Sequence, residues 1–323
     1  MDPTYPLVPV LNFLSAVLVL IPFMITRRLL SNVGITMLGM WILLLSTWQG
    51  VNAILWSNHA ENIAPVWCNV ASHLLFGMEV GIPASQMVIT RQLYRIAHTQ
   101  GVLPGGWQKV FSSSLSFETY HIVQGYRFDI YEEFGCYPVH AAGLSVLLVN
   151  SWAILFPIAS MFLHSQVFRT FFQHYIHLSE FADDSNPVMR VQYVRILIQC
   201  SLHVILVLPL NVLILIIQIK RAPLATQSFY PGWEVAHRTW EPRSIPAIEW
   251  RQNYWDVLNF QLTQYLSISI APVFFGLAGL TDEVVEKMER VFRTVVRRPR
   301  MRGPNSTKMS AFKVASRSTA HDL

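Results

Sequence analysis

Few side chains in this sequence could do chemistry, and Glu79 is the most unusual of them because it stands inside an apolar stretch. It lies 11 residues after Cys68 and 12 before Arg91, close to the middle of that stretch. A carboxylate in an apolar layer is costly unless it is protonated or faces other polar groups. Two interpretations stay open: a contact with a polar ligand or a switch, and a packing hydrogen bond to a neighbouring helix.

Two histidines, His73 and His203, also lie in apolar stretches, and neither has an aspartate, glutamate or histidine three or four residues further along. Because a zinc site needs three or four protein ligands, this spacing argues against a zinc hydrolase. The sequence has no Ser/His/Asp order, phosphate-binding loop or G-x-G-x-x-G string that stands out. It therefore predicts no catalytic residue, no metal site and no cofactor, and the protein is not expected to be an enzyme.

A further apolar stretch contains Pro209, two residues before Asn211. A proline inside a helix removes one backbone hydrogen bond and kinks the helix, which frees a carbonyl oxygen. Asn211 or water could donate a hydrogen bond to that oxygen. The pattern is compatible with an activation hinge and equally with a static kink.

The elements that must position these residues are long apolar helices. The chain has 323 residues, of which 52% are hydrophobic and 13% charged, whereas a soluble domain has about 25% charged residues. This composition excludes a nucleic-acid binder, a disordered scaffold and almost any cytosolic enzyme. A helix of 19 residues is about 28 Å long, enough to cross a bilayer core of roughly 30 Å. Six stretches of that size or longer are predicted to span: 7–25, 33–56, 70–90, 139–163, 196–219 and 255–280.

Charge sets the expected topology. Arg27 and Arg28 follow the first span, which predicts an N-terminus outside. All of the net charge of +5 lies in residues 281–323, as expected of a cytoplasmic tail beside an anionic leaflet. Six spans would leave this tail outside, so we predict a seventh helix at about Trp107–Gly125. The expected fold is an all-α membrane protein, a seven-transmembrane helix bundle (1–280) followed by a basic cytoplasmic tail (281–323).

The tail itself has the pattern of an amphipathic helix. Between Thr281 and Arg302, acidic residues come first and basic residues later, an order that suits the helix dipole. Apolar residues recur at spacings of three and four on one face, namely Val284, Val285, Met288, Val291, Phe292 and Val295. We expect this helix to lie along the inner leaflet.

The seven-helix topology also sorts the loops. Inner loops are expected at 91–106 and 164–195, and outer loops at 57–67, 127–136 and 220–254. Cys68 and Cys136 both fall on the outer face, where the oxidising exterior makes a disulfide between them feasible. The last outer loop contains Trp233, Trp240 and Trp250, which fit either a binding loop over the bundle mouth or an aromatic belt at the membrane surface.

Specific strings resemble one family of receptors. G-I-P-A-S at 81–85 and R-Q-L-Y-R-I-A at 91–97 closely resemble the third helix and second inner loop of fungal mating receptors for farnesylated, a-factor-type peptide pheromones. The fourth-helix exit and second outer loop of that family are similar to Y-H-I-V-Q-G-Y-R-F-D-I at 120–130 and G-C at 135–136. Further agreement comes from S-N-V-G at 31–34, L-P-L at 208–210, Trp233 with His237, and F-F-G-L at 274–277.

The resemblance implies a G-protein-coupled receptor in the plasma membrane that binds a prenylated peptide pheromone and activates a heterotrimeric G protein, with no role for nucleic acid. On the ligand side it suggests Glu79, His73, Trp233, His237 and Trp240. On the G-protein side it suggests Arg91, Arg95, Arg190 and Arg195, with Pro209 and Asn211 as the hinge. The alternatives are an orphan member without a mating role and a seven-helix transporter. A transporter would be expected to have paired intramembrane charges, and only Glu79 fits that description.

Overall fold

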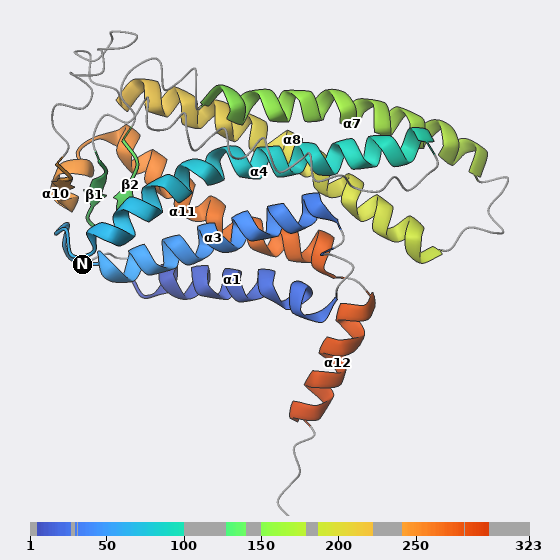
Figure 1. Ribbon diagram of the computed structural model, residues 1–323, viewed down its shortest axis with the longest axis horizontal. Coiled ribbons are helices and arrows are strands. Elements are labelled where there is room, and N and C mark those ends of the chain that lie inside the picture. The colour runs from blue at the N-terminus through green and yellow to red at the C-terminus, as the bar shows by residue number, and fades with distance from the viewer. Residues whose placement is uncertain are drawn as a thin grey trace, which may run out of the picture.

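The protein is a bundle of long helices that lie side by side (Figure 1). The computed structural model describes residues 5–26, 30, 32–99, 127–139, 150–178, 187–221, 241–280 and 282–296. Six long helices make up the described bundle: α1 (Leu7–Ile25), α3 (Val33–Leu55), α4 (Pro65–Thr99), α7 (Ser151–Leu178), α8 (Pro187–Arg221) and α11 (Tyr254–Phe274). Among the described residues, four helical segments are long and apolar enough to cross a membrane: Leu7–Ile25, Val33–Leu55, Ser151–Thr170 and Tyr254–Leu277.

The predicted spans agree well with α1, α3 and α11, but the predicted inner loop at 164–195 is wrong. Helix α7 continues to Leu178 and α8 begins at Pro187, so most of that segment is helical. The reason is that hydropathy reports contact with lipid, whereas a helix satisfies its own backbone hydrogen bonds and can continue into water. The predicted helix at Trp107–Gly125 and residues 140–149 of another predicted span lie outside the described residues.

The two ends of the bundle differ in structure (Figure 1). At one end, here called the strand end, lie three short strands, β1 (Asp129–Tyr131), β2 (Gly135–Tyr137) and β3 (Arg243–Ile245), together with the one-turn helix α10 (Ala247–Trp250). The other end, the α12 end, is where α11 passes through the π-helical turn η4 (Phe275–Gly279) into α12 (Asp282–Val296). Helix α12 projects away from the bundle (Figure 1).

Apolar side chains fill the interior in separate clusters. The cluster toward the α12 end joins residues of six helices: Val19, Ile35, Leu38, Ile42, Ile89, Leu93, Val167, Leu197, Ala271 and Phe274. The cluster at the strand end joins α3, α4 and α11 to the strands: Leu45, Trp48, Ala71, Leu75, Met78, Tyr131, Tyr137, Ile245, Trp250 and Phe260. Helices α3 and α4 approach closely at Gly81, where any Cβ atom would overlap the indole of Trp41.

A buried polar cluster holds α1, α3 and α11 together inside the bundle. Ser267 and Asn12 are fully buried, and the Ser267 hydroxyl lies 3.0 Å from Asn12 Oδ1 and also contacts Gln49 Oε1. Gln49 Nε2 donates to the Thr263 carbonyl at 3.3 Å. Because apolar helices gain little from burying apolar surface in lipid, such polar contacts between helices contribute to fixing their mutual position.

Candidate functional site

The strand end is the most elaborately built surface of the described chain. Strand β1 pairs antiparallel with β2 and parallel with β3, in the order β2-β1-β3. The turn between β1 and β2 contains Glu133 with φ of 77° and leads to Gly135 with φ of 76°. A positive φ is unfavourable for a residue with a side chain, so the surroundings must hold Glu133 in place. One such contact is its backbone N–H, which donates to the carbonyl of Trp56 at the end of α3 (2.7 Å).

A disulfide ties this small sheet to the bundle. Cys68, in the first turn of α4, is bonded to Cys136 in β2, with a Cα–Cα distance of 5.2 Å. Both cysteines are fully buried, in a cluster with Trp56, Phe128 and Ile130. The bond therefore fixes the sheet against the helix that also contains Glu79.

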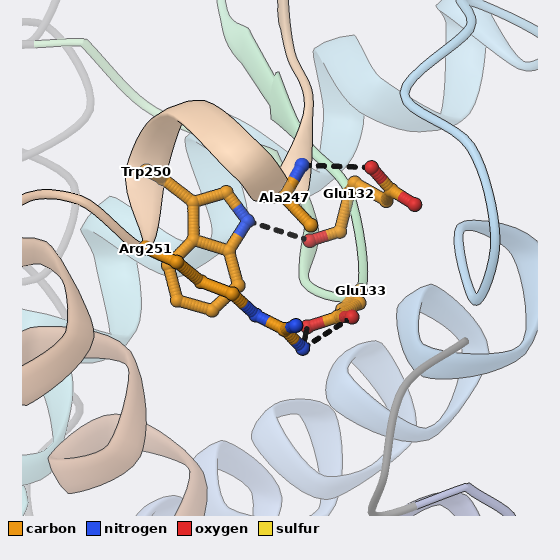
Figure 2. A network of polar contacts seen from close by, with 5 residues as sticks. All are labelled: Glu132, Glu133, Ala247, Trp250 and Arg251. Atoms are coloured by element: carbon orange, nitrogen blue, oxygen red, sulfur yellow. Dashed lines mark hydrogen bonds and ion pairs between the residues drawn. The ribbon is translucent and has the colours of Figure 1, made fainter.

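An ion pair and two hydrogen bonds join the β1–β2 turn to α10, as Figure 2 shows. Arg251 Nη2 donates to both carboxylate oxygens of Glu133, at 2.7 and 2.8 Å. Glu133 is only 4% exposed whereas Arg251 is 44% exposed. The Ala247 N–H donates to Glu132 Oε2 (2.7 Å), and Trp250 Nε1 donates to the Glu132 carbonyl (3.2 Å). A buried carboxylate needs such a partner because desolvation without one is costly.

Beneath this network, aromatic rings fill the mouth of the bundle. The ring of Phe260 in α11 lies 4.5 Å from that of Phe134, 4.7 Å from Tyr131, 5.1 Å from Tyr137 and 5.4 Å from Trp250, measured between centroids. Beside these rings lies a small cavity of about 10 Å³, lined in part by Trp48, Phe134, Tyr137 and Gln264. This is about the smallest cavity that can hold one water molecule. Among the described residues, aromatic rings therefore fill this end of the bundle.

Outside the aromatic rings lies a larger, open cavity of about 510 Å³. Its lining comes from the β1–β2 turn and the α10 segment: Glu132, Pro246, Ala247, Ile248, Arg251 and Gln252. None of these residues was singled out from the sequence. The acidic character of the loop at 127–136 was visible, but a pair 118 residues apart has no local sequence signal.

The residues expected on the ligand side are not brought together by the described structure. Glu79 is half-buried in α4, and it has no hydrogen-bond partner among the residues that the structure describes. His73 Nδ1 lies 2.6 Å from the Asn69 carbonyl, one turn earlier in the same helix. The other three expected residues, Trp233, His237 and Trp240, lie outside the described residues. A ligand role for these five residues stays a prediction.

The four arginines expected on the G-protein side lie on the halves of α4 and α8 toward the α12 end. Arg91 is exposed and Arg95 is half-buried. Arg190 and Arg195 lie in the first turns of α8, in backbone that the sequence reading assigned to a loop. Their contact with a partner also stays a prediction.

Asn211 does satisfy a carbonyl freed by a proline, but the proline is not Pro209. Asn211 Nδ2 donates to the carbonyl of Ala153 in α7 at 2.7 Å. In a regular helix that carbonyl would accept from the N–H of residue 157, and residue 157 is a proline in α7. The expectation that Asn211 repairs the kink of its own helix is therefore corrected. The side chain instead links α8 to α7 one turn before Pro157.

Two more polar contacts follow the same pair of helices. His164 Nε2 lies 2.7 Å from Ser201 Oγ, and Asn150 Nδ2 donates to Gln218 Oε1. Since α7 and α8 are antiparallel neighbours (Figure 1), these contacts and that of Asn211 lie at three levels along their length. A movement of α8 relative to α7 would have to break or exchange them.

Comparisons with known proteins point to one family. The family model for the pheromone A receptor (STE3) matches residues 7–297. The pheromone B alpha 2 receptor of Schizophyllum commune is 31% identical over 287 residues, covering 88% of this chain and 45% of that protein. The pheromone B alpha 3 receptor of the same fungus (strain H4-8 / FGSC 9210) is 28% identical, covering 88% and 47%. Pheromone receptor 1 of Mycosarcoma maydis is 27% identical over 306 residues, covering 88% and 82%. The chain thus spans about half the length of the Schizophyllum relatives.

Proposed function

The chain belongs to the pheromone A receptor family, and from that premise we propose that it is a G-protein-coupled receptor for a farnesylated peptide mating pheromone. The match over residues 7–297 carries the proposal, because it covers the bundle and all of α12. The apolar helices support the coarser statement that this is a multi-pass membrane receptor. Its location in the plasma membrane is part of the proposal.

The proposed topology has seven spans, with the strand end outside and the α12 end inside. Helix α4 runs from the strand end to the α12 end, and β1 lies back at the strand end (Figure 1). Because α4 ends at the α12 end and β1 lies at the strand end (Figure 1), the described ends of the chain are compatible with the proposed further crossing. The disulfide at the strand end fits an oxidising exterior, and the basic tail fits a cytoplasmic α12 end.

The proposed ligand would meet a bundle whose mouth is filled by aromatic rings. A farnesyl group has to stay in apolar surroundings, where each buried CH₂ contributes about 0.8 kcal/mol. We expect it to enter through the outer leaflet or by displacing the rings around Phe260. The ligand activates the receptor only if it binds the rearranged state more tightly than the state in which the rings fill the mouth. Glu79, His73, Trp233, His237 and Trp240 are the proposed ligand-side residues.

The proposed G-protein surface is the α12 end, with Arg91, Arg95, Arg190 and Arg195 as its basic side chains. Helix α12 lies beside it and is held at its start, where Lys287 Nζ donates to the Ile25 carbonyl that ends α1 (2.9 Å). Val284 is fully buried against the bundle, whereas Val285 is 49% and Met288 39% exposed. Such a helix, with apolar residues on one face and charges on the other, is suited to lie on the inner leaflet.

The proposal is tested in a yeast reporter strain that lacks its own pheromone receptor. The chain is expressed with a panel of synthetic farnesylated peptides, and each peptide is paired with its unprenylated form. We expect at least one farnesylated peptide to raise G-protein reporter output, and its unprenylated form to lose most of that effect. Surface expression without a response to any farnesylated peptide would contradict the proposal.

The role of the tail has a separate test. Replacing Arg293, Arg297, Arg298 and Arg300 by glutamate should release α12 from an anionic leaflet and lower reporter output without changing peptide binding. The matched control reverses three charges further along, at Lys308, Lys313 and Arg317. Output equal to the parent at equal surface expression would show that the first four charges serve topology alone.

A further inference from the structure

Two carboxylates and one arginine lie at or beside the open cavity of the strand end. Only one of the two carboxylates pairs with the arginine. Arg251 donates to both oxygens of Glu133 through the same nitrogen, so the charges of these two side chains cancel. Glu132 lines the cavity, and only its Oε2 is engaged, by the N–H of Ala247. Its Oε1 accepts no hydrogen bond from any residue in the described ranges. Among the described residues, the Glu132 carboxylate is therefore the one charge of the cavity lining that no ion pair compensates.

The geometry keeps the two carboxylates apart. In Figure 2, Glu132 reaches toward Ala247 on one side of the Trp250 indole contact, and Glu133 turns to Arg251 on the other. The left-handed backbone of Glu133 (φ 77°) permits this arrangement of two consecutive glutamates. Arg251 stacks over the ring of Trp250 with its Cζ 5.3 Å from the ring centroid. These contacts keep the Arg251 guanidinium paired with Glu133 and not with Glu132, which lines the cavity.

Apart from Glu132 and the paired Arg251, the lining of the cavity is apolar or neutral. Pro246, Ala247 and Ile248 form one wall, and Ile248 is 74% exposed. The surrounding chain is acidic, because residues 127–139 and 241–256 contain six acidic and three basic side chains. A surface of this sign attracts cations over distances of about one Debye length, roughly 8 Å at physiological salt. A cation next to an apolar group would fit both the carboxylate and the wall.

We infer that this cavity binds the positively charged part of the peptide ligand, an N-terminal ammonium or a basic side chain, with Glu132 as its counter-charge. The inference rests on the proposed function, since it assigns a subsite to that ligand. A prenylated peptide has one apolar end that stays in the membrane layer, and its polar remainder has to extend into water. The strand end, with a cavity of about 510 Å³ outside the aromatic rings, is where that remainder arrives.

The test combines receptor variants with peptide variants. Glu132→Gln removes the charge and keeps an oxygen that can accept from the Ala247 N–H, so the β1–β2 turn should stay folded. Glu249→Gln is the matched control, since Glu249 is an exposed acid in α10 that does not line the cavity. Each farnesylated peptide that binds the purified receptor is made with its amino group acetylated and with each lysine or arginine replaced by glutamine. Binding to purified receptor in nanodiscs and reporter output in cells are measured in parallel.

We expect Glu132→Gln to weaken binding of one cationic peptide form roughly tenfold, as for the loss of a charge-assisted hydrogen bond. The corresponding neutral peptide should bind parent and variant equally, and Glu249→Gln should bind every form like the parent. Equal affinity of Glu132→Gln and parent for all peptide forms would overturn the inference. The inference would also be overturned if the loss of affinity caused by Glu132→Gln and the loss caused by neutralising each peptide charge were additive.

The two readouts separate this inference from the proposed function. Charge-dependent binding with a silent reporter would support the subsite and contradict the receptor function. A reporter that responds to a farnesylated peptide, together with binding that does not depend on the peptide charge, would support the receptor function and contradict the subsite. If no farnesylated peptide binds the purified parent at all, both are contradicted.

Discussion

The two ends of the bundle use the same ion pair, glutamate with arginine, in opposite ways. At the strand end, Glu133 is 4% exposed and its partner Arg251 is 118 residues away in the chain. In α12, Arg290 pairs with Glu286 and Arg293 with Glu289, four residues apart, and all four side chains are more than half exposed. Exposed pairs contribute little, whereas breaking a buried one leaves a desolvated charge.

The comparison shows that the two ends are held together by different kinds of contact. The strand end is fixed by a disulfide, a buried ion pair and interlocking aromatic rings. In helix α12, Lys287 donates a hydrogen bond to the end of α1, and the ion pairs Arg290–Glu286 and Arg293–Glu289 are local and exposed. A rigid cap suits recognition of a ligand by shape, and a loosely held amphipathic helix suits a surface that follows the membrane. Four measurements test this contrast, and they follow in order of decreasing expected effect.

Removing the disulfide should have the largest effect. In the chain-entropy account, a bridge that closes a separation of 68 residues stabilises the fold by about 4 kcal/mol. Cys68→Ser should therefore lower the melting temperature of the purified receptor strongly and reduce its surface expression. Cys200→Ser in α8 is the control, because it removes a thiol outside this bond. Equal melting temperatures for the two variants would show that the cap does not depend on the bridge.

Breaking the buried pair should rank second. Arg251→Ala leaves the Glu133 carboxylate buried without its partner, and since Arg251 itself is partly exposed we expect a loss of about 2 kcal/mol. Arg243→Ala, which removes an exposed arginine from β3 of the same sheet, should cost far less. Thermal unfolding followed by tryptophan fluorescence compares the two. A similar loss from both variants would mean that the pair has no special weight.

Between the ends, the contact from Asn211 to Ala153 should have an intermediate effect. Asn211→Leu removes a hydrogen bond between helices, for which we expect a loss of about 1 kcal/mol. In a Pro157→Ala background, the restored N–H of residue 157 can serve the Ala153 carbonyl. Asn211→Leu should then cost at most half as much. Additive losses in this double-mutant cycle would argue that Asn211 does not compensate for Pro157.

The exposed pairs of α12 should have the smallest effect. Replacing Glu286 and Glu289 by glutamine removes both i,i+4 pairs, and the melting temperature should shift by no more than about 1 °C. The Glu286 hydrogen bond and charge raise the pKa of Arg290 above its usual value, and replacing Glu286 removes that shift. A shift as large as that of Arg251→Ala would erase the contrast between the ends.

The sequence correctly predicted the structural features that depend on short stretches of chain. The apolar stretches predicted α1, α3 and α11 closely, and the spacing of apolar and charged residues after Leu280 predicted a helix where α12 lies. It placed Cys68 and Cys136 on one face, and the structure joins them. It failed at 164–195, because loss of hydropathy there marks the edge of the membrane layer and not the end of the helices.

The sequence is therefore sufficient to identify a membrane receptor that is built of apolar helices, has a basic amphipathic tail and belongs to a pheromone receptor family. Helical periodicity and hydropathy are properties of neighbouring residues, so they can be read locally. Three contacts are visible in the tertiary structure alone. Arg251 pairs with Glu133, Asn211 donates to the carbonyl freed by Pro157, and Phe260 packs among the aromatic rings at the mouth of the bundle. Each of these contacts depends on how far one helix is rotated and shifted against another. That offset is set by the packing of all the helices together, and no short segment encodes it.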